Sequence, residues 1–414
     1  MKVSPYAIAG FLATWLGLAA WPGLVMADEM GVMERARPDY DAKGLPLGGF
    51  RLYPTLDLGV AGDTNIYRTD NNEKGDAYFT IAPNLDLRSD WNNDLVEVTA
   101  AVSNYRYAEN SGENHTDWNV GGHGRLDILR GTTADGEVDY VSTHEPRYSP
   151  DEPNSAAEPT HYSDVHAQGT FTHDAGLLAF SFGGTFDRFD YDATPLIGGG
   201  VLNNNDRDEE KYSLQGRVSL ELSEGYSFFV RGTYNNRAFD LQRDRNGYDR
   251  GSHGYSADAG AEFRLTDLLR GEAYLGYAEQ SFHAPLPDVN GIDFGAKLTW
   301  YPDALYTVHL SAERRFTDTT ILGASVSDDR VVTLGIDYEL LRNLIVQGST
   351  SYTSSRFAGA FRNDTVWGAS IGAQYLINEN MRATLGYGFS NRASSIPGQN
   401  FRDHTIQAGI KLAL

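Results

Sequence analysis

The sequence predicts an all-β fold: a transmembrane, outer-membrane type of antiparallel β-barrel with about 18 strands. Three observations support this class. From Phe50 to the C-terminus, apolar and polar side chains alternate in one segment after another, which is the period of a strand. Short turns alternate with long polar loops, and aromatic residues gather near the strand ends, as in bacterial outer-membrane barrels. No run of 18 apolar residues follows the N-terminal leader, so no membrane-spanning helix is expected.

The N-terminus has the pattern of a secretory signal peptide. Lys2 precedes an apolar core, and Val25-Met26-Ala27 supplies small residues for cleavage before Asp28. The next stretch is polar, contains Pro and Gly, and shows no sustained period. The expected organisation is therefore a signal peptide (1–27), a periplasmic N-terminal segment (28–49) and a transmembrane β-barrel (50–414).

Composition excludes several classes of function. The 414 residues carry a formal net charge of −22, which argues against nucleic acid as a partner because phosphate binding needs clustered Lys and Arg. Cysteine is absent, so neither disulfides nor thiol chemistry can contribute. The 24 Tyr, 19 Phe and 44 Gly suit twisted, half-buried strands joined by tight turns.

The expected strands are recognised by alternation, as in Tyr255-Ala257-Ala259-Ala261-Phe263, where every second residue is apolar. We call these alternate positions, which share one face of the strand, the apolar parity, and the positions between them the opposite parity. Eighteen segments show this pattern and are long enough to cross a bilayer at a tilt. In chain order their apolar sets span 52–60, 79–87, 96–102, 118–128, 134–140, 165–171, 178–182, 212–222, 228–234, 255–263, 269–277, 292–300, 306–312, 332–340, 344–352, 367–375, 381–389 and 404–414.

The connections between these segments alternate in length. Short turns such as RGTT (130–133) and NEN (378–380) are followed by long polar stretches such as 144–163 and 192–210. This asymmetry predicts periplasmic turns at one end and extracellular loops at the other, with both termini on the turn side. The last strand, HTIQAGIKLAL (404–414), would pair with the first strand so that no sheet edge remains free.

Aromatic residues on the apolar parity are expected to form two girdles at the membrane interfaces. The band near the long loops comprises Trp118, Tyr212, Tyr255, Tyr277, Tyr352 and Trp367. The band near the short turns includes Trp300, Tyr338 and Tyr375.

The opposite parity is predicted to line the lumen, because so many charged groups cannot form a dry core. The lumen-lining candidates are Glu97, Arg125, Asp139, Arg217, Arg231, Arg264, Glu272, Lys297, Glu313 and Arg315. Only about 22 residues separate the cleavage site from the first strand, so water, narrowed by in-folded loops, is expected to fill the lumen. The charges either set a transverse field for solutes or form structural pairs that brace the wall.

No catalytic, cofactor or metal residues are assigned, and we do not expect an enzyme. His123, His166 and His309 are lumen candidates, but no local motif places a Ser beside them. The 203–211 loop holds Asp206, Asp208 and Glu210 at alternate positions, which suits calcium, although Lys211 stands where a calcium loop needs Gly. Both a weak calcium site and a solvated acidic loop remain open.

The stretch 32–69 and the block IAPNLDLRSDW (81–91) resemble a family of outer-membrane proteins, the beta-barrel porin 2 type associated with exopolysaccharide biosynthesis and export clusters. The resemblance rests on the RPDYD…G…LG.F.L.P.L.LG order and on Asn65-Ile66-Tyr67. It continues more loosely along the barrel. Asp63-Thr64 replaces an acidic pair that is common in the family.

This resemblance implies that the barrel is the exit channel for a secreted exopolysaccharide, working with a polysaccharide export lipoprotein. Aromatic residues near the outer mouth would then either stack on the sugar rings of the passing polymer or pack beneath loops. These residues are Tyr105, Tyr107, Phe189 and Tyr191. Two rival functions remain: a general or small-solute porin, and a non-conducting barrel whose extracellular loops bind a partner.

The expected location is the cell outer membrane. The expected partners are outer-membrane lipid, lipopolysaccharide and the barrel assembly machinery, which would recognise the C-terminal strand. That strand ends on Leu414 in place of the usual Phe.

Overall fold

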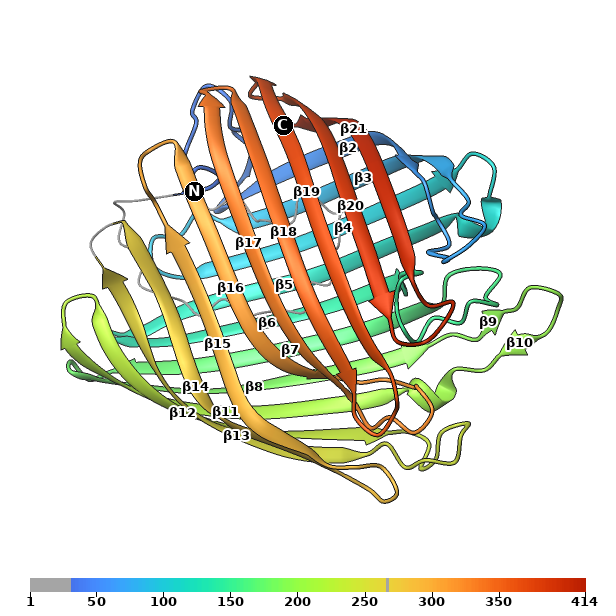
Figure 1. Ribbon diagram of the computed structural model, residues 1–414. Coiled ribbons are helices and arrows are strands. Elements are labelled where there is room, and N and C mark those ends of the chain that lie inside the picture. Colours follow the sequence, from blue (N-terminus) through green and yellow to red (C-terminus); the bar gives the residue numbers. More distant parts are fainter. Residues whose placement is uncertain (1–30, 266–267) are drawn as a thin grey trace.

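The computed structural model describes residues 31–265 and 268–414, and it is a closed antiparallel barrel (Figure 1). The expected signal peptide lies outside the described residues. The long strands are β2 (Phe50–Asp63), β3 (Asp76–Ser89), β4 (Leu95–Tyr107), β5 (His115–Leu129), β6 (Thr132–His144), β7 (His161–Asp174), β8 (Leu178–Tyr191), β11 (Glu209–Ser223), β12 (Tyr226–Phe239), β13 (Ser252–Leu265), β14 (Leu269–Phe282), β15 (Val289–Trp300), β16 (Tyr306–Thr317), β17 (Ser327–Leu341), β18 (Leu344–Phe357), β19 (Asn363–Asn378), β20 (Met381–Ser394) and β21 (Phe401–Ala413).

Three short strands and two single turns of 3₁₀ helix complete the described secondary structure. β1 (Leu45–Leu47) forms a tight hairpin with the start of β2, and β9 (Thr194–Pro195) pairs with β10 (Val201–Leu202) in the loop after β8. The 3₁₀ turns cover Ser111–Glu113 and Asn205–Arg207. Within the described ranges, no helix is long and apolar enough to cross a membrane.

The barrel closes where the last strand meets the first. β21 pairs with β2 in antiparallel register, with Ile410 opposite Leu58 and Lys411 opposite Asp57. The Lys411 ammonium lies 3.0 Å from the Asp57 carboxylate on the inner face. The fold class predicted from alternation is therefore confirmed, including the strand number and the pairing that removes the free edge.

The two faces of the wall differ as the parity predicts. Large apolar side chains such as Val138, Leu275 and Ile371 are exposed on the outer face, whereas charged and amide groups point inward. Successive residues of a strand point to opposite faces, so a single apolar parity makes a continuous apolar belt. The long strands run for 12 to 16 residues, which exceeds the roughly 9–11 needed to span a bilayer.

One seam of the barrel is less completely paired. β15 and β16 pair only between Gly295–Trp300 and Val308–Glu313. Above this stretch the Arg314 guanidinium fills the gap: Nη1 donates to the Ile292 carbonyl (2.8 Å) and Nε to Asp328 (2.7 Å). Gly291, at φ +141°, allows the turn away from the ladder where Arg314 inserts. A side chain thus replaces the missing ladder bonds.

Arg314→Ala is expected to weaken this seam. The change leaves the nearly buried Asp328 without its cation and two strand carbonyls without a donor, a loss of about 3–5 kcal/mol by comparison with other buried pairs. The temperature at which the folded band disappears on SDS gels should fall. Arg342→Ala, in an exposed turn, is the control and should leave that temperature unchanged. An unchanged transition in Arg314→Ala would show that the seam does not depend on this side chain.

Candidate functional site: the lumen

All ten predicted lumen residues lie on the inward parity, and most of them form ion pairs with residues on the same strand or within three strands. Arg217 lies 2.7 Å from Glu272 and 3.0 Å from Glu262. The other pairs are Glu97 with Arg88 (3.2 Å), Arg125 with Asp127 (3.2 Å), Arg231 with Asp258 (3.1 Å) and Arg315 with Glu313 (3.4 Å). This local pairing favours the bracing interpretation over opposed charged ladders. Within the described part of the chain, Arg264 and Lys297 have no ion pair.

Aromatic side chains that the pattern did not single out support the arginines. The Arg217 guanidinium lies 3.7 Å from the centre of the Phe229 ring, and that of Arg231 lies 4.1 Å from the Tyr274 ring. Phe229 is buried although it is on the inward parity. In the sequence, Phe229 stands out because it is an apolar residue at a position of β12 where the alternation predicts a polar one. That exception was the signal for the packing of Arg217 on its ring.

The wall formed by β6, β7 and β8 is acidic. Asp139, His166 and Asp187 are direct neighbours across the three strands, and Asp164 is two residues from His166. His166 Nδ1 is 2.6 Å from Asp187 Oδ1. Gly121 on β5 leaves the space that Asp139 occupies, since a Cβ there would lie 1.9 Å from Asp139 Oδ1. Lys211 on β11 lies opposite Asp187, but its ammonium is already paired with Glu209 (3.0 Å) and Asp318 (2.6 Å). The wall therefore keeps an excess of negative charge and attracts cations.

Residues 145–160, between β6 and β7, form what we call the constriction loop. Its base is fixed to neighbouring loops by buried ion pairs. Glu145 accepts from both Nη atoms of Arg207, at 2.7 and 2.9 Å, and Arg147 Nε donates to Glu113 at 3.0 Å. Arg207 also stacks on Tyr191, with its guanidinium 3.9 Å from the ring centre.

The tip of the constriction loop reaches the far side of the barrel. Asp151 Oδ1 accepts from Thr319 Oγ1 (2.9 Å) and from the Thr320 amide (2.8 Å), both in the loop between β16 and β17. The Tyr148 carbonyl accepts from Arg392 on the inner face of β20, at 2.8 Å. β6 and β7 lie on the opposite wall from β16 and β17 (Figure 1). The loop therefore crosses the outer mouth and narrows the lumen.

Burial shifts the protonation of the loop tip. The Glu152 carboxyl is buried, with one oxygen 3.2 Å from Arg147 and the other without a hydrogen-bond partner among the described residues. Burial raises the pKa of Glu152 from its ordinary 4.5 to about 7, with a further contribution from Glu145. Burial also raises the pKa of Asp151. A buried acid that lacks one partner favours its neutral form.

Conductance through the lumen is expected to rise from about pH 4.5 to about pH 7. The docked loop keeps the Glu152 proton up to about pH 7, whereas a released loop would lose it near 4.5. Docking is therefore strongest at low pH and weakens as pH rises between these values. Asp318, whose pKa is lowered to about 2 mainly by Arg237 and Lys211 against the effect of burial, titrates below this window. Glu152→Gln should flatten the response in planar bilayers; an equally steep response in that variant would exclude Glu152 as the cause.

The short-turn end is also narrowed. Residues 31–44, which we call the N-terminal strap, lie against the inner wall at that end (blue in Figure 1). Val32 is fully buried against Ile345 and Leu376. The Val32 amide donates to Thr307 Oγ1 (2.8 Å), and Arg37 lies 2.9 Å from Glu339. The sequence indicated only a polar segment ahead of the barrel, yet its described part packs inside the mouth.

The four mouth aromatics pack beneath the loops. Tyr105 stacks on His115 with ring centres 4.5 Å apart, and Tyr107 contacts Tyr78 at 4.9 Å. Tyr191 lies under Arg207, and the Phe189 ring lies 4.4 Å from the Lys211 ammonium. Of the two interpretations, the geometry favours packing over an open series of sugar-stacking steps.

The histidines pair with carboxylates. His123 lies 3.0 Å from Asp135, and His309 lies 3.2 Å from Asp337. A further series of hydrogen bonds, which the sequence analysis did not predict, has the order of a catalytic triad. Ser142 Oγ is 2.8 Å from His161 Nε2, and His161 Nδ1 is 2.6 Å from Asp192. It lies at the loop end of the wall. Ser142 is paired with strands on both sides, so the nearby amides are engaged in the ladder and do not form an oxyanion hole.

The acidic residues of the loop after β8 do not gather as a calcium site. Asp206 pairs with Arg245, and Glu210 accepts from the Tyr212 hydroxyl. Asp208 instead lies near Asp190 and Asp240, with carboxylate oxygens within 4.8 Å of one another. Arg188 occupies that cluster, 2.7 Å from Asp190 and 2.6 Å from Asp240. Because the Arg188 guanidinium already occupies the space between the carboxylates, we assign no metal there.

The girdle residues lie on the outward parity, and all of them except Tyr338 are well exposed. Tyr338 stacks on Tyr306 with ring centres 4.4 Å apart.

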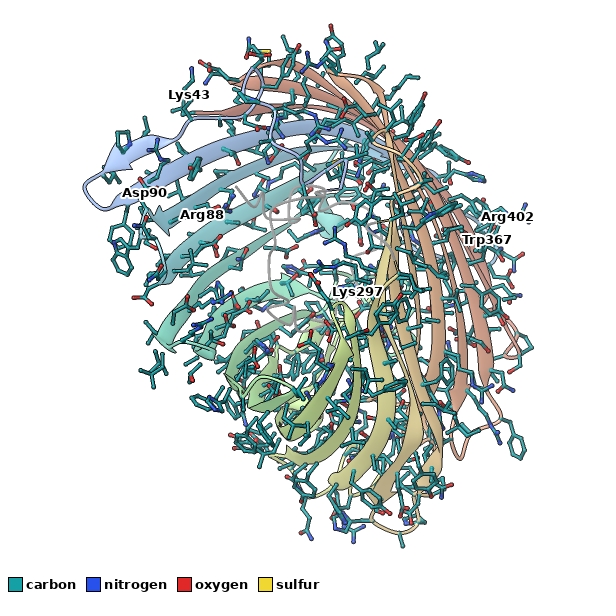
Figure 2. All side chains as sticks on the ribbon, turned by 90° about the vertical axis from the view of Figure 1, so that its left-hand side faces the viewer. Lys43, Arg88, Asp90, Lys297, Trp367 and Arg402 are labelled. Carbon is teal, nitrogen blue, oxygen red and sulfur yellow. The ribbon has the colours of Figure 1, made fainter. Side chains whose placement is uncertain are left out.

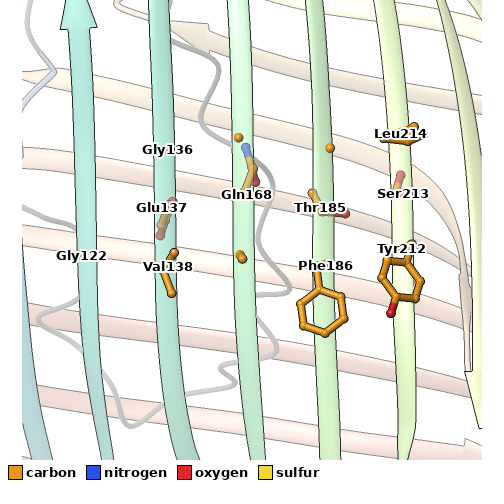
Figure 3. Close-up of a pocket in the computed structure, with 13 residues that line it drawn as sticks. Gly122, Gly136, Glu137, Val138, Gln168, Thr185, Phe186, Tyr212, Ser213 and Leu214 are labelled. Carbon is orange, nitrogen blue, oxygen red and sulfur yellow. The ribbon is translucent and has the colours of Figure 1, made fainter.

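An outward depression of about 460 Å³ lies beside Tyr212 and Phe186, where Gly122, Gly136 and Gly184 leave space (Figure 3). This depression faces away from the lumen, so it is part of the apolar belt and is not a solute site.

A closed barrel with an apolar outer belt, a charged lumen and a loop across its mouth defines a porin-like outer-membrane barrel. The chain belongs to the family described as "Putative beta-barrel porin 2", which matches residues 37–414. No curated protein matches the sequence significantly.

Solved porins share the strand architecture only loosely. OpdO of Pseudomonas aeruginosa is 12% identical, with a TM-score of 0.46 over 88% of this chain and 97% of that one. OccK2 (OpdF) of the same species, solved in complex with glucuronate, is 11% identical, with a TM-score of 0.46 over 90% and 100% of the two chains. A BenF-like porin from Pseudomonas fluorescens Pf-5 is 11% identical, with a TM-score of 0.46 over 89% and 100%.

Proposed function

We propose that this protein is a pore for small hydrophilic solutes, with a preference for cations. The limit on solute size rests on the constriction loop, because this loop spans the mouth from β6–β7 to the loop after β16. The acidic wall of β6 to β8 supports the charge preference, because Asp139, Asp164 and Asp187 face the lumen beside His166, while the neighbouring Lys211 is paired with Glu209 and Asp318. Passage requires no chemistry, so no catalytic residue is proposed.

A polymer exit, expected from the family resemblance alone, is a weaker proposal. A hydrated polysaccharide would have to displace the constriction loop together with the buried Glu145–Arg207 pair. Breaking such a pair is costly, since it leaves a charge in a site with little water. The aromatic residues at the mouth, on which the sugar rings of a polymer would stack, are covered by loop residues. The proposed passage of small solutes does not require this pair to break.

The reversal potential in a salt gradient tests the proposal. In planar bilayers with potassium chloride, the wild-type pore should be cation-selective. The triple variant Asp139→Asn, Asp164→Asn, Asp187→Asn should move the reversal potential toward zero, because it removes the fixed negative charge of the wall. Glu224→Gln, in an exposed turn at the other end of β11, is the control and should leave the potential unchanged.

An anion-selective wild type would contradict the charge preference. A barrel that never conducts would contradict the pore itself and favour a protein whose loops bind a partner.

A further inference from the structure

A basic patch lies on the outer face of the barrel, away from the lumen. Arg314, Arg330 and Arg356 share the outward parity at the loop ends of β16, β17 and β18. Arg330 is directly opposite Arg314, and Arg356 is directly opposite Asp328. Like charges opposite one another destabilise a sheet unless an anion lies between them. Here the patch holds three guanidinium groups and a single carboxylate, that of Asp328.

Asp328 is already committed to Arg314. Arg314 Nε and Nη2 bond its two carboxylate oxygens at 2.7 and 3.1 Å, and the remaining Arg314 donors go to strand carbonyls. Arg330 and Arg356 are exposed and form no ion pair among the residues that the structure describes. The outward positions above Tyr352 and Trp367 on β17 to β19 hold no other carboxylate; they are Asp328, Arg330, Ser354, Arg356, Asn363 and Thr365.

The surroundings of the patch match an amphipathic anion. Below Arg330 and Arg356 lie exposed apolar side chains, Val332, Tyr352 and Trp367, and Trp367 points away from the barrel in Figure 2. Charges above and an apolar belt below are the order in which an outer-leaflet lipid presents its phosphate and its acyl chains. The loop end of an outer-membrane barrel faces that leaflet.

At the same height on the other side of the barrel, an outward arginine is balanced by carboxylates. There the outward Arg188 is neutralised by Asp190, Asp240 and Glu210. Arg106 on β4 and Arg402 on β21 are also exposed, outward and without an ion pair among the described residues, but they lie apart on separate strands, whereas Arg330 and Arg356 lie on adjacent strands.

We propose that Arg330 and Arg356 bind the phosphate of a phosphorylated glycolipid of the outer leaflet, with its acyl chains over Val332 and Trp367. The two residues are diagonal neighbours on adjacent strands, about 7 Å apart at Cα. Both guanidinium groups can therefore reach one phosphate, which arginine binds with paired hydrogen bonds. The proposal rests on the barrel and its orientation and does not depend on what passes through the lumen.

Native mass spectrometry of the full-length mature protein tests the site. Bisphosphorylated lipid A, its dephosphorylated form and inorganic phosphate are the probes. Wild type should retain lipid A, and Arg330→Gln with Arg356→Gln should weaken its binding at least about tenfold, as expected when charge-assisted bonds are lost. Dephosphorylated lipid A should bind wild type as weakly as lipid A binds the variant. Arg130→Gln with Arg342→Gln, exposed at the short-turn end, should bind like wild type.

Two results would overturn the proposal. Equal retention of lipid A by wild type and by the Arg330/Arg356 variant would place the glycolipid elsewhere. Competition by inorganic phosphate at the same concentration as lipid A would show that a free anion, without acyl chains, suffices. Single-channel conductance of the variant should equal that of wild type, which separates this site from the proposed pore and also shows that the variant barrel is folded.

Discussion

Replacing Arg207 by Ala is expected to raise the single-channel conductance severalfold. Glu145 and Arg207 are both buried at the base of the constriction loop, with two hydrogen bonds between them. Removing one partner of a buried ion pair costs about 3–5 kcal/mol, because the other charge is left without compensation. About 1.4 kcal/mol corresponds to a tenfold change, so the docked loop loses at least a hundredfold in stability. A loop that swings out leaves the outer mouth wide.

The control for this experiment is Arg243→Ala. Arg243 is exposed in the loop after β12 and, among the residues that the structure describes, donates only to the Gly247 carbonyl, so its loss should not change the conductance. Adding Glu145→Ala to Arg207→Ala should recover part of the wild-type value, since the uncompensated carboxylate is then removed. Wild-type conductance in Arg207→Ala would mean that the loop remains across the mouth without this pair or does not limit the current.

Val32→Glu is expected to release the N-terminal strap and open the periplasmic mouth. Val32 has no exposed surface and packs on Ile345 and Leu376. A carboxylate there would lie against apolar side chains, and the neighbouring Arg37 guanidinium is already engaged by Glu339 and the Val32 carbonyl. Burying a charge in such a site is costly. The strap should detach, although Arg37 still faces Glu339. Conductance should increase, and residues 31–44 should become sensitive to protease added on the periplasmic side.

Leu47→Glu tests the specificity of that result. Leu47, on β1, is 53% exposed, so the same change adds a charge without burying it. This variant should behave as wild type in both assays. Protease resistance of the strap in Val32→Glu would contradict the packing described for Val32 and would remove the strap from the account of the pore.

The wall of the barrel could be predicted from the sequence for a physical reason. In a membrane barrel most outward positions face lipid and most inward positions face water, so a period of two is imposed on each strand. That constraint places residues as far apart in the chain as Leu58 and Ile410 on the same face and in adjacent strands. It also assigns Arg217 and Glu272 to the lumen before their contact is known.

The constrictions could not be predicted, because no local pattern encodes them. Asp151 meets Thr320 and Tyr148 meets Arg392 across the mouth, and these contacts join segments that no periodicity relates. The strap gave a faint signal in Val32 and Met33, two apolar residues in a polar stretch. Arg314 gave another, a charge on an otherwise apolar parity, which proved to bridge the β15–β16 seam. Phe229 is the corresponding exception on the inner face.

The central claim is that the lumen passes small solutes and excludes large ones because the constriction loop crosses its mouth. Swelling of liposomes that contain the wild-type protein, measured with neutral sugars of increasing size, tests it most directly. The swelling rate should be high for a monosaccharide, fall steeply with each added sugar, and vanish for dextran, while Arg207→Ala should extend the series to larger sugars. Equal rates for all sizes in the wild type, or no swelling with any sugar, would contradict the account.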